Sequence, residues 1–329
     1  MRRHLLVFLI VATAVASAAA QEGKYRAPRT ETGRPDLQGV WSFNTGVPLQ
    51  RPAAVADKKV LTKEEFESRR AAMVNALKSI GKIAPVEDVG FDWMDGRLHV
   101  EDLRTSLITY PENGRLPATL DGVRKMPQVD DFIALIADGK GPPPAALGAL
   151  LAMFTGGKKD SYTDFMMSER CLFDAPVPLV PQIDDNYVQI VQSPDHLVLI
   201  SDFYRRIIGL DGKPQVGDAI RSWAGVSRGR WEGETLVVET RNFSDKPPSF
   251  AGAGNARDKV VTERFTRTGS NRIDVSATIV DAKTFKDRIE LSFPMALVDA
   301  SIYEGACHEG NYSMRNSLAA ARQADAQKK

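Results

Sequence analysis

The most constraining feature of this chain is a run of short apolar segments between residues 186 and 298, separated by turn sequences. Apolar and polar residues tend to alternate within the segments, as in half-buried strands, and Gly, Asn, Asp or Pro marks the turns. The predicted strands span residues 187–191, 196–200, 204–210, 223–231, 235–240, 260–267, 273–280 and 289–295. No helical pattern separates them, which predicts a mainly β fold built on an antiparallel meander. A meander this long must hide its edges, so we expect closure into a barrel or barrel-like sheet.

The region before residue 186 is more mixed. Alternation predicts a strand over residues 37–43 and another over 103–110. Apolar residues at helical spacing predict a helix over 62–80, which Thr62 and Glu65 begin as a capping box. Further helices are expected near 129–137 and 145–154, and an Ala-rich C-terminal helix over 313–326. We therefore predict an extended leader over 21–36 and one mostly-β domain over 37–329, with a helical insertion around 60–160.

The N-terminus carries an export signal. Arg2 and Arg3 precede an apolar run over residues 5–15, and small residues lead to Ala20. This order is typical of a secretory signal peptide, here residues 1–20, with cleavage near Ala20. The apolar run is too short to span a bilayer comfortably, which disfavours the alternative of a retained membrane anchor. The sequence predicts a periplasmic or secreted protein.

Charge and composition limit the partners. Without Arg2 and Arg3 the 43 basic residues fall to 41, against 42 acidic ones. Nucleic-acid binding needs a positive excess, so we expect no nucleic-acid partner. No later segment approaches the roughly 18 apolar residues of a membrane-spanning helix, so no membrane span is expected. The oligomeric state is left open.

Two cysteines, Cys171 and Cys307, are the only ones in the chain. An even count in an exported protein favours a disulfide, and two cysteines allow a single pairing. The alternative is two separate buried thiols.

Common metal and nucleotide motifs are missing from the sequence. Beyond the signal peptide the histidines are His99, His196 and His308, and none has the spacing of a metal-binding motif. There is also no Walker loop, Rossmann fingerprint or nucleophile elbow. We therefore expect no metal and no cofactor.

The densest group of chemically active side chains spans residues 307–312. His308, Glu309 and Tyr312 could act as an acid–base set on a loop made rigid by the disulfide, with Asn311 contacting the ligand or substrate. Adjacent strand residues point to opposite faces, so the partner of His308 could instead be Glu239 or Glu263. The alternative is a polar loop whose side chains are simply solvated.

Gly39 and Trp41 lie in a Gly-x-Trp sequence similar to that of lipocalin-like barrels, where Gly permits close packing and Trp closes one end of the barrel. Three residues are a weak signal, and a core Trp on an ordinary strand is an equally good interpretation.

Several segments together resemble a family of uncharacterised secreted bacterial proteins with SERC, GRWEG-TLVVET-NF and CHEGNY-type motifs. The matching residues are 34–41, 103–108, 113–117, 168–171, 186–192, 206–214, 229–243, 263–267 and 306–312. The resemblance covers most of the chain and implies export, but it assigns no reaction. The family carries His and an acidic residue where this chain has Phe203 and Tyr204. That position is therefore not catalytic, or this member prefers a different substrate.

The first function hypothesis is a periplasmic barrel, with the lipocalin-like barrel as one candidate form, that binds a small amphipathic molecule in its mouth. Its predicted ligand-binding residues combine apolar walls with polar anchors: Trp41, Tyr187, Phe203, Trp223, Arg104, Arg170, Arg221 and Asn311. The alternative is a metal- and nucleotide-independent lyase, isomerase or hydrolase that uses His308. A third, weaker hypothesis is a structural envelope protein. Burial of His308 in a cavity beside a carboxylate would favour the enzyme, whereas exposure would favour binding or structure.

Overall fold

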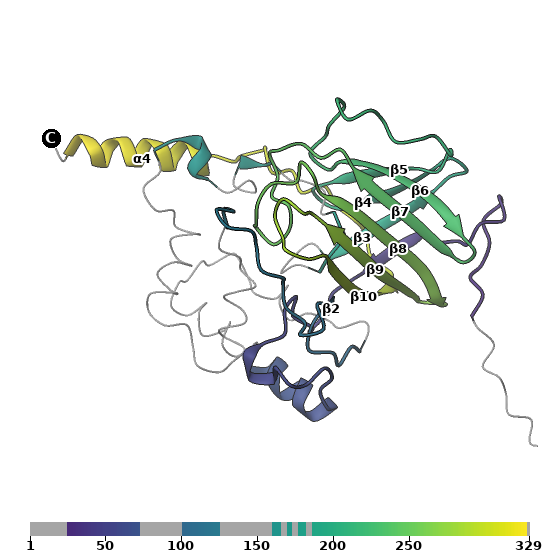
Figure 1. Cartoon of the computed structure of the whole chain (residues 1–329). Coiled ribbons are helices and arrows are strands. Elements are labelled where there is room, and N and C mark those ends of the chain that lie inside the picture. The colour runs from purple at the N-terminus through teal and green to yellow at the C-terminus, as the bar shows by residue number, and fades with distance from the viewer. Residues whose placement is uncertain are drawn as a thin grey trace, which may run out of the picture.

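The computed structural model describes residues 25–72, 101–125, 160–165, 170–172, 177–181 and 186–327 (Figure 1). The predicted signal peptide, the helices expected near 129–137 and 145–154, and His99 lie outside these residues. Within them the fold is mainly β, with a helix over 63–72 and a C-terminal helix, α4, over Ser313–Gln327. Two short 3₁₀ helices, η1 (Ala53–Val55) and η3 (Tyr162–Asp164), lie in loops before β2 and β3.

Ten strands form one sheet whose ends meet. Strand β1 pairs with β3 on one side and with β10 on the other, which closes a barrel of nine strands and leaves β2 outside, paired with β10. The strands are β1 (Gly39–Ser42), β2 (Ile108–Tyr110), β3 (Tyr187–Gln192), β4 (His196–Ile200), β5 (Arg205–Gly209), β6 (Val226–Glu232), β7 (Thr235–Arg241), β8 (Val260–Gly269), β9 (Arg272–Val280) and β10 (Ile289–Val298). The predicted barrel and C-terminal helix are confirmed.

One pairing departs from the antiparallel meander. Strands β5 and β6 run parallel, with Ile208 opposite Ser227 and Gly209 opposite Arg228. Parallel neighbours require a connection long enough to return the chain to the other end of the sheet. The segment over residues 210–225, which contains no strand, makes this return. The sheet is therefore mixed, and the prediction of a wholly antiparallel order is wrong at this point.

The predicted strand over 103–110 is also shorter in the structure, where β2 begins at Ile108. The residues before it bond to loops instead: the N–H of Thr105 donates to the carbonyl of Lys59, and that of Leu107 to the carbonyl of Pro48. The first helix begins as predicted. The N–H of Glu65 donates to Thr62 Oγ1 and the N–H of Thr62 to Glu65 Oε2, which completes the capping box. Residues 73–80 of this predicted helix are not described.

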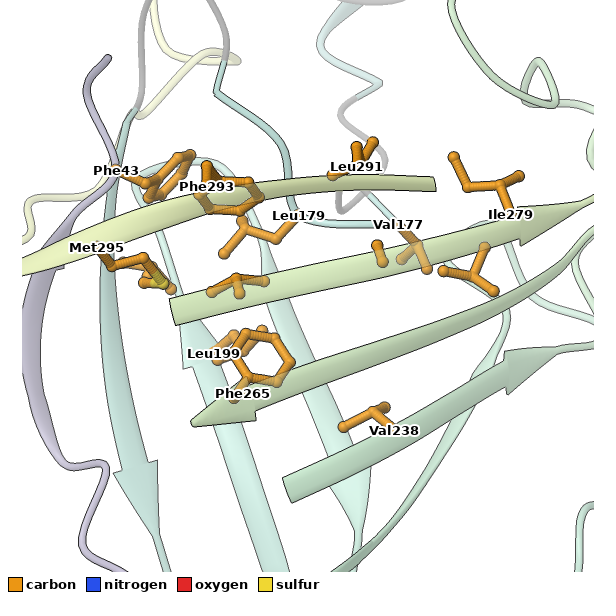
Figure 2. Packing of buried hydrophobic residues seen from close by; sticks show 14 of the residues in the cluster. Phe43, Val177, Leu179, Leu199, Val238, Phe265, Ile279, Leu291, Phe293 and Met295 are labelled. Atoms are coloured by element: carbon orange, nitrogen blue, oxygen red, sulfur yellow. The ribbon is translucent and has the colours of Figure 1, made fainter. Parts of the chain in front are cut away.

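Alternation along the strands sorts side chains into an inner and an outer set. Along β9 every second residue from Ile273 to Ile279 is buried, and β8 buries Val261, Glu263, Phe265 and Arg267 in the same way. The inner set forms one hydrophobic cluster that fills the barrel (Figure 2). None of the described helices is both long and apolar enough to cross a membrane.

The two ends of the barrel differ. The end where β6 turns into β7 holds Trp41, which is fully buried, and the guanidinium of Arg267 lies 5.4 Å from its ring centroid. Trp41 Nε1 donates to the carbonyl of Leu37 at 2.9 Å. Gly39 has a φ of +131°, a backbone conformation that residues with a side chain rarely adopt, so this position favours glycine. Trp41 is therefore a packing residue at one end of the barrel.

The cysteine pairing is confirmed: Cys171 and Cys307 form a disulfide with their Cα atoms 5.6 Å apart. It joins the segment that precedes β3 to the loop that precedes α4. That loop runs on into a helix that projects away from the barrel (Figure 1). Arg322 of α4 donates to the carbonyl of Asp160, so the helix also contacts the region around η3.

Replacing Trp41 with Ala should lower the free energy of unfolding by about 3–5 kcal/mol, because a large buried side chain and its contact with Arg267 are lost. Denaturant unfolding measures the change. Trp223, which is 38% exposed, provides the control, since Trp223→Ala should change stability far less. Equal effects of the two substitutions would contradict the assignment of Trp41 to the barrel core.

Replacing both Cys171 and Cys307 with Ser should destabilise the protein. The bridge closes a loop with a sequence separation of 136, for which chain entropy sets a ceiling of about 5 kcal/mol. Thermal unfolding of the oxidised protein and the double variant measures the difference. Peptide mapping without reductant that found both thiols free in the native protein would refute the bridge.

Candidate functional site

The predicted acid–base group lies on the surface. His308 and Glu309 are exposed in the turn between β10 and α4, and Tyr312 is 63% exposed. Asn311 has a structural role: its Nδ2 donates to Cys171 Sγ at 2.9 Å, and its Oδ1 accepts from the Ser313 hydroxyl at 2.7 Å where α4 begins. By the criterion of exposure, this placement favours a binding or structural role over the enzyme hypothesis. The catalytic role of His308 stays a prediction.

The predicted arginine anchors hold loops in place. Arg104 makes a bidentate contact with Asp102 and donates to the hydroxyl and carbonyl of Ser292, which fixes its segment to β10. Arg221 donates to the carbonyls of Phe243 and Arg257. The guanidinium of Arg170 lies 5.1 Å from the ring centroid of Tyr162.

The aromatic residues predicted to form the apolar walls of the site lie in different parts of the structure. Trp41 is inside the barrel, whereas Trp223 is partly exposed in the loop before β6. Tyr187 is half-buried and alternates with the inward residue Val188. Phe203 lies in the turn between β4 and β5, where its ring packs against Gly305. The predicted binding residues therefore do not form one common surface.

The structure shows a polar cluster inside the barrel on four strands, of which the sequence indicated only Glu263, as a possible partner of His308. Arg206 of β5 and Glu263 of β8 form an ion pair, with their side chains 2% and 0% exposed. Arg206 also donates from Nε to Ser227 Oγ at 3.0 Å and from Nη2 to Thr240 Oγ1 at 2.9 Å. The two hydroxyls lie 2.9 Å apart. We call Arg206, Glu263, Ser227 and Thr240 the inner cluster.

Strand alternation places the inner cluster near the end of the barrel where β4 turns into β5. Arg206 is the second residue of β5 and follows the buried Tyr204, while Arg205 and Ile207 are exposed. Ser201, 1% exposed, is opposite Tyr204 in the turn and donates its N–H to the carbonyl of that residue. It is therefore a diagonal neighbour of Arg206 on the inner face.

Arg206 Nη1 and Ser201 Oγ are buried polar atoms at this end of the barrel. Within the part of the chain that the structure describes, neither Arg206 Nη1 nor Ser201 Oγ has a hydrogen-bond partner. Buried polar groups are nearly always paired, and an unpaired one costs about 1–3 kcal/mol. These atoms therefore have hydrogen-bonding capacity that the described residues do not use.

A non-strand segment, residues 177–181, contacts the inner cluster. The N–H of Leu179 donates to Glu263 Oε1 at 2.8 Å. Val177 and Leu179 are 6% and 1% exposed and belong to the hydrophobic cluster of the barrel. Figure 2 shows both side chains among inward residues of the strands, including Leu199 and Phe265. Lys259 Nζ donates to the carbonyls of Val177 and Ser249, which fixes this segment to β8.

Tyr110 and Asp287, whose pKa values are shifted, lie near the surface rather than inside the barrel. Tyr110 donates its hydroxyl to Asp287 Oδ2 at 2.8 Å; this hydrogen bond raises the pKa of Tyr110 and lowers the pKa of Asp287. Arg288 stacks on the Tyr110 ring, with its guanidinium carbon 3.9 Å from the ring centroid. These contacts connect β2 to the residues just before β10, at the surface of the protein. Among the described residues, no group of three or more His, Cys, Asp or Glu side chains could hold a metal ion.

Comparison with known proteins adds no relative from which roles could be transferred. No family model, curated protein or solved structure matches the chain. The resemblance to the secreted bacterial family therefore stays a prediction based on its motifs. The functional assignment depends on the geometry of the inner cluster.

Proposed function

We propose that this protein binds a small amphipathic molecule inside its barrel, with the polar head of the molecule at the inner cluster. A barrel of about eight strands is just wide enough for its side chains to fill or for one small ligand. Ligand sites are typically apolar, with a few polar groups that orient the ligand. The barrel combines an apolar interior with one such group near its β4–β5 end.

The observation that carries the proposal is the unpaired donor Nη1 of a guanidinium that is itself buried. Arg206 is 3% exposed, and three strands supply partners for its Nε and Nη2 while Nη1 has none among the described residues. A hydrogen bond to a charged group contributes about 1.5–3 kcal/mol, so an acceptor at Nη1 gains affinity. Ser201 Oγ offers a second donor nearby.

The proposal includes the compartment. The signal-like N-terminus and the family resemblance predict a periplasmic or secreted protein, and a disulfide is typical of such oxidising environments. The alternative of an enzyme that uses His308 depends on residues 307–312, where His308 and Glu309 are exposed. We expect a carrier or sensor of a small molecule without a nucleic-acid partner.

Replacing the ion pair as a unit tests the role of the inner cluster. In the double variant Arg206→Met/Glu263→Leu both charges are removed together, because a lone buried charge would destabilise the fold by about 3–5 kcal/mol. Prodan, a neutral amphipathic naphthylamine whose emission shifts to the blue in apolar surroundings, carries a ketone oxygen that can accept a hydrogen bond from Arg206 Nη1, and it should bind the wild-type protein. The double variant should bind it at least about tenfold more weakly, equivalent to about 1.4 kcal/mol.

The matched control is Arg104→Met/Asp102→Leu. This pair also joins an arginine to a carboxylate, at 2.6 Å, but it lies outside the barrel interior. The control variant should bind the probe like the wild type, with circular dichroism confirming that both variants fold. Absence of wild-type binding, or equal binding by both variants, would refute the proposed function.

A further inference from the structure

We infer that the head group bound at the inner cluster is a neutral amide, and that the ligand takes the place now occupied by residues 177–181. This inference rests on the proposed function and specifies its ligand. Glu263 Oε1 now accepts a hydrogen bond from the main-chain N–H of Leu179, at 2.8 Å. The segment thus shows which chemistry the inner cluster recognises.

Charge balance selects a neutral ligand. Arg206 and Glu263 are both almost fully buried and neutralise each other. A carboxylate or sulfonate head would add an uncompensated negative charge to this interior, and an ammonium head would add a positive one. Burying an unpaired charge is far less favourable than burying a neutral group that makes hydrogen bonds.

Hydrogen-bond complementarity selects an amide among neutral groups. Glu263 Oε1 accepts a hydrogen bond, while Arg206 Nη1 and Ser201 Oγ lack partners among the described residues and can donate one. A primary or secondary amide carries an N–H and a carbonyl oxygen on adjacent atoms, so it can satisfy both sides. An ester or ketone lacks the donor, and a carboxylate also lacks it.

Displacement of residues 177–181 supplies the space. This segment belongs to none of the strands, yet the side chains of Val177 and Leu179 fill part of the barrel core. An alkyl chain or an apolar peptide side chain would replace these contacts with similar ones. The measured affinity is then reduced by the stability of the resident segment, because the two compete for one position.

Competition with the bound naphthylamine probe separates the head groups. Decanamide and decanoate share an apolar chain and differ in the head, and decanamide should displace the probe at a concentration at least about tenfold lower. Acetyl-Val-Pro-Leu-Val-amide, which copies residues 177–180, forms the third arm. Displacement by the peptide at lower concentration than decanamide identifies a peptide ligand, and the reverse order identifies an acyl amide.

Weakening the packing of residues 177–181 tests whether the ligand displaces them. Leu179→Ala should increase the affinity for decanamide about tenfold, because the resident side chain competes less well. Leu197→Ala is the control: Leu197 is equally buried, at 1%, but lies near the opposite end of β4 and should leave the affinity unchanged.

The two proposals fail differently. If decanoate displaces the probe as well as decanamide, or if Leu179→Ala leaves the affinity unchanged, the amide inference is refuted while probe binding through Arg206 stands. If the probe does not bind the wild type, the proposed function itself fails.

Discussion

Closure of the barrel between β1 and β10 is the constraint on which the other features depend. Val40, Trp41 and Ser42 pair with residues 296–298, which come from the far end of the sheet. Without this pairing the sheet would have two open edges and no interior. With it, side chains along each strand point alternately to solvent and to the core. Trp41, Arg206 and Glu263 are inner residues for this one reason.

The sequence predicted the strands well because alternation is a local signal that tertiary contacts here reinforce. Strands β3, β4, β7, β8 and β9 lie within a few residues of their expected bounds, and the capping box at Thr62 holds. The parallel pairing of β5 with β6 and the short β2 depend on which distant segment lies beside them. Local patterns carry no such information.

The candidate site was harder to predict than the fold, for a physical reason. Motif reasoning favours clusters of polar residues close together in sequence, and residues 307–312 form such a cluster in a solvated turn. The inner cluster instead collects single polar residues from four strands. Glu263 stands between Val261 and Phe265, and parity alone identifies it as an inward charge. Replacing a buried ion pair with apolar residues is often neutral or stabilising, so stability alone does not explain its presence.

The disulfide has a mechanical consequence. All the strands from β3 to β10 lie between Cys171 and Cys307, whereas β1 and β2 precede the first cysteine. A force that pulls on the two chain ends passes through the bridge and bypasses the residues between the cysteines. Such a force can strip β1 from its neighbours and open the barrel, but it cannot extend the remaining eight barrel strands. The oxidised chain is in effect a covalent ring with two tails, and only its reduced form can pass as a single extended strand through a narrow pore.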